Sequence, residues 1–323
     1  MALKNPLPSA YAWLLLFSLG SVRSSSFIPK PAQLPSVKPP EGKETSFISP
    51  DRNLALEDGS GFRREAHLLA SQNSTSVFSQ SNVVTWGGDC WWSDGADSSC
   101  VADALGSSVQ NVTSTNLAFA ALKTDGSVVT WGDPKEGGDS ETVRQALSSS
   151  VKAVYSNNVA FAAVLHNGSV VTWGVSGNGG NSMTVQAALA SGRAQAVYST
   201  ELAFAAITSE GNVITWGHSS HGARTTTLRS TLESGGFQTI SSTLYAFAAV
   251  KMNGSITVWG DSSGGGDDRT VRSALASGVR TVRASHNAFA AVTLSGHVVS
   301  WGAGNYGGDS LTVRSVLTSE NVQ

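Results

Sequence analysis

Residues 118–132 read AFAALKTDGSVVTWG, and this stretch decides the fold. An apolar run leads to Asp125-Gly126, and a second apolar run follows it and ends at Trp131-Gly132. Glycine at this point suits the positive φ of a tight hairpin turn, and runs rich in Val and Phe favour strands. The stretch therefore predicts a β-hairpin.

The hairpin occurs five times with constant internal spacing. Each copy has a Phe, a Gly seven residues later and a Trp twelve residues after the Phe. The sets are Phe119, Gly126 and Trp131; Phe161, Gly168 and Trp173; Phe204, Gly211 and Trp216; Phe247, Gly254 and Trp259; and Phe289, Gly296 and Trp301. With a sixth Trp-Gly pair at Trp86, the tryptophan intervals are 45, 42, 43, 43 and 42 residues. Such a period indicates stacked repeat units.

The connections between the hairpins repeat as well. Apolar residues four apart, as at Val143 and Leu147, share one face of a helix, so each connection predicts a short helix. Ser140, Ser182 and Ser310 are the expected N-caps. A V-x-x-V-x-S pattern then predicts a third strand in each unit, and alanines beside each Phe predict close approach of neighbouring units.

These units predict an all-β fold, a β-propeller of about six short blades with three strands and a short helix per repeat. The alternative is an open β-solenoid arc. Residues 73–87 match the repeat poorly and Phe78 is out of register, so an incomplete propeller is a further alternative. A strand near Val322 is a candidate to complete the first sheet.

The pattern V-x-x-V, AFAAL-x-x-D-G-S-V-V-x-W-G and G-G-D-S resembles the repeat of the regulator of chromosome condensation family over about residues 76–323. The resemblance implies a propeller, although these units are shorter than is usual in that family. It also implies guanine-nucleotide exchange or a ubiquitin-ligase-associated module. An apparent signal peptide opposes the first role, and no ligase domain stands in these 323 residues.

The N-terminal region predicts entry into the secretory pathway. Lys4, the apolar run 10–22 and the small residues Ser24 to Ser26 indicate a signal peptide over residues 1–26. Residues 27–72 are Pro-rich and predict a disordered linker, and residues 73–323 form the propeller. We expect a secreted or luminal protein. A plastid protein is the alternative, since Phe27-Ile28-Pro29 resembles the start of a plastid transit peptide.

The composition of the chain limits the classes of partner that it can bind. The chain has a net charge of -2 and 14% charged residues, so it lacks the basic surplus that nucleic acid binding requires. No second apolar span follows the signal segment, so we expect no membrane contact after cleavage. The sequence predicts no cofactor, no metal and no catalytic residue. It leaves the oligomeric state open.

Candidate sites lie where the repeat is broken. Cys90 and Cys100 bracket an insertion and predict a disulfide, and Trp91 and Trp92 within it are candidate binding residues. The repeated tryptophans are expected to be core. Possible N-glycosylation sites stand at Asn73, Asn111, Asn167 and Asn253.

A charge pattern accompanies the connections. Arg144, Arg272 and Arg314 each follow an Asp by five residues, which predicts ion pairs such as Asp139 with Arg144. Arg224 replaces the acid before Arg229, so Arg224 is a further candidate binding residue. We therefore expect a scaffold that binds an unknown protein through its loops, without catalysis. A glycan- or small-molecule-processing enzyme on the propeller face is the alternative.

Overall fold

The computed structural model describes the backbone of four strands between residues 52 and 86, then residues 98–106 and 108–310. Two compact units divide the chain, one of residues 1–49 with 55–64 and one of residues 50–54 with 65–323. All the repeats belong to the second unit. Trp91, Trp92, Cys90 and Asn73 lie outside the described residues.

Five three-stranded antiparallel sheets form the repeats, and each sheet keeps its strands in chain order. They are β5 (Val109–Ser114), β6 (Ala118–Lys123) and β7 (Val128–Gly132); β8 (Val151–Ser156), β9 (Ala160–Leu165) and β10 (Val170–Gly174); β11 (Ala194–Ser199), β12 (Ala203–Thr208) and β13 (Val213–Gly217); β14 (Phe237–Ser242), β15 (Ala246–Lys251) and β16 (Ile256–Gly260); and β17 (Val279–Ala284), β18 (Ala288–Thr293) and β19 (Val298–Gly302). The all-β prediction with three strands per repeat is confirmed.

The hairpin joins the second and third strand of every sheet. Phe119 pairs with Trp131 across β6 and β7, and the other four sheets have the same Phe–Trp register. Gly126 at the turn has a φ of +79°, a conformation that glycine adopts without steric cost. The two rings stack with their centroids 5.1 to 5.3 Å apart in the five sheets.

Short helices lie in the connections that lead into β5, β8, β11 and β14. They are α1 (Ala102–Leu105), α2 (Arg144–Leu147), α3 (Gln186–Gly192) and α4 (Arg229–Leu232). The apolar pair is confirmed, since Leu147 is buried and Val143 half-buried. Ser140 and Ser182 stand at N-cap positions, but their hydroxyls make no cap hydrogen bond and instead bond Thr130 and Thr172 of the preceding strand. The segment after Ser310 lies outside the described residues.

A joint of Gly, Phe and Trp connects each sheet to the next. The first Gly of a Gly-Gly or Gly-Ala pair, such as Gly179, has a φ of +109° and packs directly under Phe204 of the following sheet. Its carbonyl accepts a hydrogen bond of 3.1 Å from Nε1 of Trp216. The equivalent indoles of Trp173, Trp259 and Trp301 bond Gly137, Gly222 and Gly265. The repeated tryptophans therefore hold neighbouring sheets together.

Alanines make this close approach possible. Ala160 and Ala162 of β9 are fully buried and belong to the same apolar cluster as Phe204 and Trp216 of the next sheet. Larger side chains at these positions would push the sheets apart. Ala beside the Phe is therefore explained by the packing between units, as the sequence predicts.

A belt of hydrogen bonds also crosses from sheet to sheet where the first strand turns into the second. The Asn158 N–H donates to Glu201 O, and Glu201 N–H donates to Leu244 O. Ser156 and Ser199 repeat the pattern with side chains, since Ser199 Oγ donates to Ser156 O at 2.8 Å. Each serine ends the V-x-x-V-x-S strand, which gives that motif its physical role.

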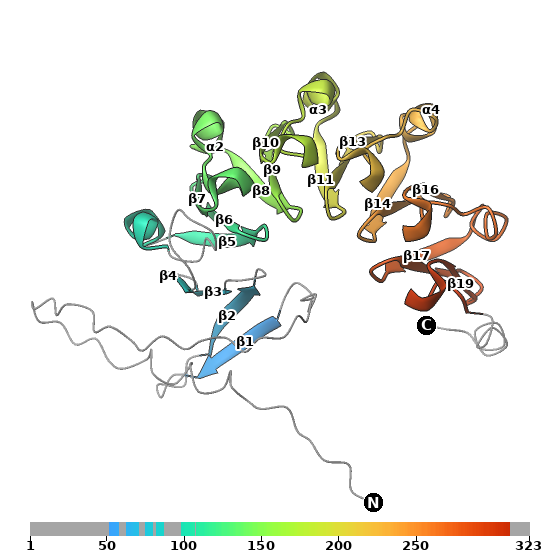
Figure 1. Ribbon diagram of the computed structural model, residues 1–323, viewed down its shortest axis with the longest axis horizontal. Coiled ribbons are helices and arrows are strands. Elements are labelled where there is room, and N and C mark those ends of the chain that lie inside the picture. The colour runs from blue at the N-terminus through green and yellow to red at the C-terminus, as the bar shows by residue number, and fades with distance from the viewer. Residues whose placement is uncertain are drawn as a thin grey trace, which may run out of the picture. The chain divides into compact units, whose positions relative to one another are not determined.

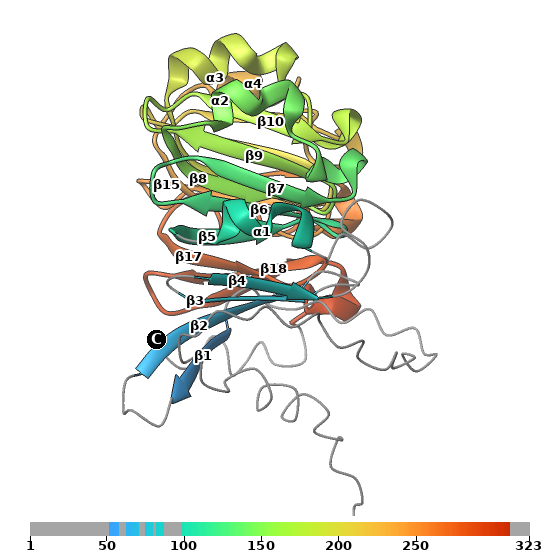
Figure 2. The ribbon, with the colours of Figure 1, turned by 90° about the vertical axis from the view of Figure 1, so that its left-hand side faces the viewer.

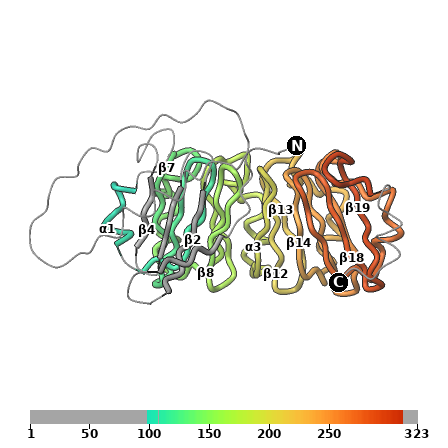
Figure 3. The backbone as a smooth tube through the Cα atoms, turned by 90° about the horizontal axis from the view of Figure 1, so that it is seen from below, coloured from blue at the N-terminus to red at the C-terminus, as the bar shows by residue number. Residues whose placement is uncertain are grey.

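The sheets therefore form the blades of a β-propeller. Figure 1 shows the blades from β5 to β19 following one another around an arc, with α2, α3 and α4 on its outer side. The strands of neighbouring blades contact one another, as β6 and β8 do in Figure 2. Figure 3 shows the same row of blades edge-on, from β7 to β19.

The first sheet differs from the repeats. It has four strands in chain order, β1 (Arg52–Glu57), β2 (Arg63–Ala70), β3 (Thr75–Ser79) and β4 (Asn82–Trp86). Because Thr75 pairs with Trp86, Phe78 does not take the place of the repeated Phe. Strands β1 and β2 fall within the segment 27–72, whose Pro residues all lie before β1. Val322, which the sequence suggests as part of a further strand of this sheet, lies outside the described residues.

Candidate functional site

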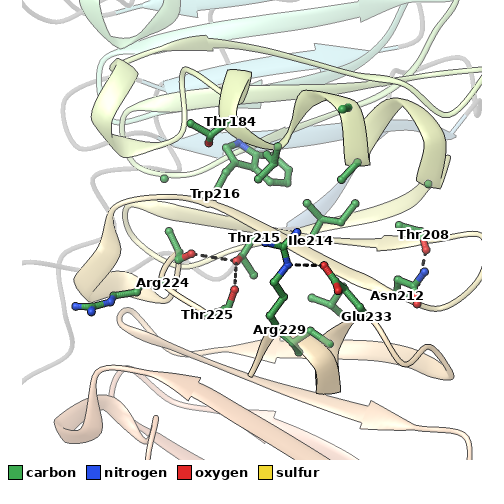
Figure 4. Close-up of a pocket in the computed structure, with 18 of the residues that line it drawn as sticks. Thr184, Thr208, Asn212, Ile214, Thr215, Trp216, Arg224, Thr225, Arg229 and Glu233 are labelled. Carbon is green, nitrogen blue, oxygen red and sulfur yellow. Dashed lines mark hydrogen bonds and ion pairs between the residues drawn. The ribbon is translucent and has the colours of Figure 1, made fainter. Parts of the chain in front are cut away.

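A groove of about 750 Å³ runs along β13 between two neighbouring blades. Its residues come from four segments, namely Ser176 to Gly192 with α3, the turn from Thr208 to Asn212, the strand β13 itself, and Ala223 to Glu233 with α4. Figure 4 shows this groove, with Thr184 and Trp216 on one side and Thr225, Arg229 and Glu233 on the other. A concave site with mixed polar and apolar walls is the usual form of a binding site.

The outer edge of β13 is the side that does not pair with β12. Thr208 N–H donates to Asn212 O and His218 N–H donates to Leu202 O, each at 2.9 Å. Antiparallel bonding alternates along a strand, so Ile214 and Trp216 bond β12. Val213 and Thr215 therefore direct their backbone N–H and C=O groups away from β12.

A hydroxyl fixes the loop beside this strand. Thr215 Oγ1 donates to Ala223 O at 3.1 Å and lies 3.2 Å from Thr225 Oγ1 (Figure 4). Thr130 and Ser300 make the same bond from equivalent positions to Gly138 O and Gly308 O. The loop that carries Arg224 is therefore held against the strand by a contact built into the repeat.

Arg224 is the positive charge of the groove that no ion pair in the described part of the chain balances. Arg229 forms an ion pair of 2.8 Å with Glu233, and Asn212 Nδ2 donates to Glu210 Oε2 at 3.2 Å. Arg224 is exposed, and among the described residues no ion pair joins it. The structure thus places Arg224, which the sequence singled out, in the groove.

The predicted pairing of the Asp and Arg columns is wrong for Arg144 and Arg272, and Arg314 lies outside the described residues. Arg144 pairs with Glu141 at 3.3 Å, and Arg272 pairs with Asp268 at 2.7 Å. Asp139 instead accepts a hydrogen bond from the N–H of Glu141 at 2.8 Å, and Asn181 and Asp267 accept from the N–H two residues on in the same way. This turn needs an acceptor oxygen and no charge, which explains why Asn replaces Asp at one position.

Other predicted residues are placed without forming a site. Cys100 lies in a 3-10 turn, Ser99–Val101, and the disulfide stays a prediction because Cys90 is outside the described residues. Asn111 is exposed on β5. Asn167 and Asn253 are exposed at hairpin turns, where each Oδ1 accepts hydrogen bonds from the N–H and Oγ of the following Ser.

A polar cluster at the strand ends was not predicted, because its members come from two loops of one repeat, the loop between β11 and β12 and the loop after β13. Ser220 Oγ lies 2.8 Å from His218 Nδ1 and 2.9 Å from His221 Nδ1. His221 Nε2 lies 3.6 Å from Glu201 of the preceding loop. Burial, and then the neighbouring His218, lower the pKa of His221. A hydroxyl, an imidazole and a carboxylate thus stand in series, but they lie outside the groove.

Glu136 is a second unusual carboxyl. Burial, and then the nearby Asp133, raise its pKa to about 7. Its Oε2 is buried and has no hydrogen-bond partner within the described residues. Its backbone carbonyl accepts a hydrogen bond from Thr115 Oγ1. The charged form of Glu136 is therefore costly to the fold.

We predict that Glu136→Gln reduces the pH dependence of stability. Because the folded pKa lies above the unfolded value of 4.5, the contribution of Glu136 is most favourable below pH 4.5. It is lost as the pH rises from 4.5 to about 7. Urea unfolding at pH 5 and pH 8 checks this, with Asp139→Asn as a control that also removes one charge. An equal fall in the stability of wild type and Glu136→Gln between these pH values would contradict the assignment.

Metal-binding clusters and membrane spans are both absent from the part of the chain that the structure describes. No group of three or more His, Cys, Asp or Glu side chains there is arranged to hold a metal ion. Over the same residues, no helix has the length and apolar character needed to span a membrane.

Comparison with known proteins gives structural likeness only. No protein-family model matches the chain, and no curated protein sequence matches it. Human WBSCR16 is 14% identical, with a TM-score of 0.46 over 81% of each chain. Prp20p of Saccharomyces cerevisiae, the yeast RCC1, is 15% identical, with a TM-score of 0.44 over 76% of this chain and 73% of its own.

The ectodomain of a plant receptor kinase shows a similar level of structural likeness to this chain. The CRINKLY WD40 ectodomain of the Arabidopsis thaliana receptor kinase ACR4 is 13% identical, with a TM-score of 0.42 over 73% of this chain and 78% of its own. At such identities and scores, the activities and partners of these proteins do not transfer to this chain.

Proposed function

We propose that this protein is a scaffold that binds another protein through the groove along β13, with Arg224 in contact with the partner. The observation that carries the proposal is the groove itself, which combines a strand edge, apolar walls and an exposed arginine. Arginine is enriched among the residues that dominate protein interfaces. The repeated residues are used for packing, in the joints between sheets and in the belt of hydrogen bonds. The positions where the repeat is broken are therefore the ones that remain for binding.

We further propose that the chain works in the secretory pathway or outside the cell. The support is the apolar segment 10–22, with Lys4 before it and small residues after it. Expression in a secretory cell line tests this by the mass shift that an N-glycosidase causes. Asn167 and Asn253 are exposed acceptors, so Asn167→Gln with Asn253→Gln is the matched control. A protein retained in the cytosol or in plastids would overturn this part.

A relation to the regulator of chromosome condensation family remains part of the proposal, and it rests on the repeat pattern of residues 76–323. It does not supply the activity. The groove offers no pair of convergent carboxylates for a glycan-processing reaction, since Glu233 is paired with Arg229 and Glu210 with Asn212. Binding is therefore the better supported function of this site.

Partner capture tests the scaffold. Tagged wild type, Arg224→Glu and Arg193→Glu are expressed in the native compartment, cross-linked and purified, and bound proteins are quantified by mass spectrometry. Arg193 is an exposed arginine outside the groove and serves as the control. We expect a partner that wild type and Arg193→Glu recover and that Arg224→Glu loses by tenfold or more. The same proteins on all three baits, or none on any, would refute the proposal.

A further inference from the structure

We propose that the groove along β13 binds an extended peptide segment by strand addition, with an acidic side chain of the peptide against Arg224. The inference rests on the proposed scaffold function and names the kind of partner segment that fits. An added strand uses backbone hydrogen bonds for affinity and side chains for specificity.

Val213 of β13 has two outward backbone groups without a partner among the described residues, whereas two equivalent positions each have one of these groups bonded. In β10, the outward carbonyl of Val170 accepts a hydrogen bond of 3.4 Å from Gln186 Nε2 of α3. In β16, the outward N–H of Ile256 donates to Leu275 O at 3.0 Å. Val213 holds the same place in β13 and Val128 in β7, and within the described residues the outward N–H and C=O of both have no hydrogen-bond partner, but only Val213 lines the groove.

A single side chain accounts for part of this difference. Arg229 stands in α4 where Gln186 stands in α3, thirteen residues after the repeated Trp. The guanidinium turns to Glu233, its ion-pair partner at 2.8 Å, and leaves the Val213 carbonyl without a donor among the described residues. The break in the repeat at Arg224 and the open strand edge therefore occur in the same blade.

The dimensions suit a short strand. Five residues of β13 extend over roughly 15 Å at about 3.3 Å per residue, and a paired strand would lie about 4.8 Å away. The apolar walls include Ala187 and Ala188 of α3 and Leu232 of α4. A segment of four or five residues with alternating apolar side chains would cover this edge.

Charge gives the segment its orientation. Arg224 lies in the loop just after β13, and Glu210 lies in the turn just before it, so the two ends of the groove differ in sign. An acidic residue of the peptide near Arg224 and a basic one near Glu210 match this pattern. Complementary charges set register and partner choice more than affinity.

The probe is an immobilised library of acetylated, amidated octapeptides, screened with fluorescently labelled full-length protein. The tightest peptide is then measured by fluorescence anisotropy against three variants. Thr215→Pro removes an outward N–H that no described residue uses, and edge strands tolerate proline. Thr215→Val is the matched control, because it loses the same hydroxyl and keeps the N–H. Arg224→Glu tests the charge.

We expect the Kd to rise tenfold or more for Thr215→Pro and less than threefold for Thr215→Val. Arg224→Glu should select basic residues where wild type selects acidic ones. If Thr215→Pro does not fold, N-methylation of the peptide replaces it. In an added strand, the N–H groups of every second peptide residue face β13. Methylation of these backbone nitrogens should abolish binding, and methylation of the residues between them should leave the Kd unchanged.

Equal affinity of the peptide for Thr215→Pro and Thr215→Val would overturn strand addition. So would equal effects of N-methylation at the two alternating sets of peptide residues. If the protein forms a concentration-dependent dimer that the peptides do not dissociate, the edge is assigned to a second copy of the chain. That result would also overturn peptide binding by strand addition. If partner capture depends on Arg224 while both backbone tests are negative, the scaffold stands and the peptide mode fails. If neither partner nor peptide binds, both proposals fail.

Discussion

Gly179→Val is expected to destabilise the protein by about 2–6 kcal/mol, from a strained backbone and an overpacked joint together. Gly179 has a φ of +109°, where a β-branched side chain is strained. A Cβ there would stand 2.6 Å from Cδ2 of Phe204, a ring that is fully buried between two blades. Neither the ring nor the backbone has room to move.

Urea unfolding followed by tryptophan fluorescence measures this effect. Gly177→Ala is the control, because Gly177 lies two residues away with ordinary φ, and an added methyl group there would meet nothing within 4 Å. We expect the control to change stability by less than about 0.5 kcal/mol, as is usual for surface substitutions. Similar stability for Gly179→Val and Gly177→Ala would show that Gly179 is not a packing element.

Phe247→Ala is expected to cost about 3–5 kcal/mol, the usual range for a large aromatic side chain removed from a core. The Phe247 ring is fully buried and stacks on Trp259 at 5.3 Å. It also covers Gly222, whose carbonyl accepts the indole N–H of Trp259 at 3.0 Å. The substitution therefore leaves a cavity inside the blade and loosens the joint to the preceding one.

Thermal unfolding by calorimetry gives the loss directly. Met252→Ala serves for comparison, since Met252 is 74% exposed at the turn of the same hairpin. A loss for Phe247→Ala no larger than that for Met252→Ala would contradict a packed blade core at this position.

The hairpins could be predicted because their determinants are local. Gly126, the apolar runs and the Phe–Trp spacing all lie within fifteen residues, and the structure has the predicted strands and register. The helix caps failed for a local reason too. The Ser140 hydroxyl has another hydrogen-bond partner in the Thr130 hydroxyl, which lies close only once the strand and connection have packed together.

The joints depend on contacts between repeats, which spacing alone does not reveal. Gly179 and Trp216 are 37 residues apart, and nothing in their separate neighbourhoods indicates a hydrogen bond. The recurrence of a Gly 36 or 37 residues before these Trp residues was the available signal. The ion pairs were assigned wrongly for a similar reason, because Arg144 had a nearer acid in Glu141.

The candidate site was predicted in part. Arg224 could be found because it interrupts a repeated acidic position. The open edge of β13 could not, since it depends on Arg229 bonding Glu233 and not the backbone. Repetition thus identifies the residues that build the propeller, and departures from it indicate where binding is to be sought.

The most direct test of a partner at β13 is hydrogen–deuterium exchange of the protein with and without its captured partner. We predict that the amides of Val213 and Thr215, which point out of the sheet, become protected in the complex, while the hairpin amide of Gly254 does not change. Unchanged exchange at Val213 and Thr215, with protection confined to other loops, would contradict the account.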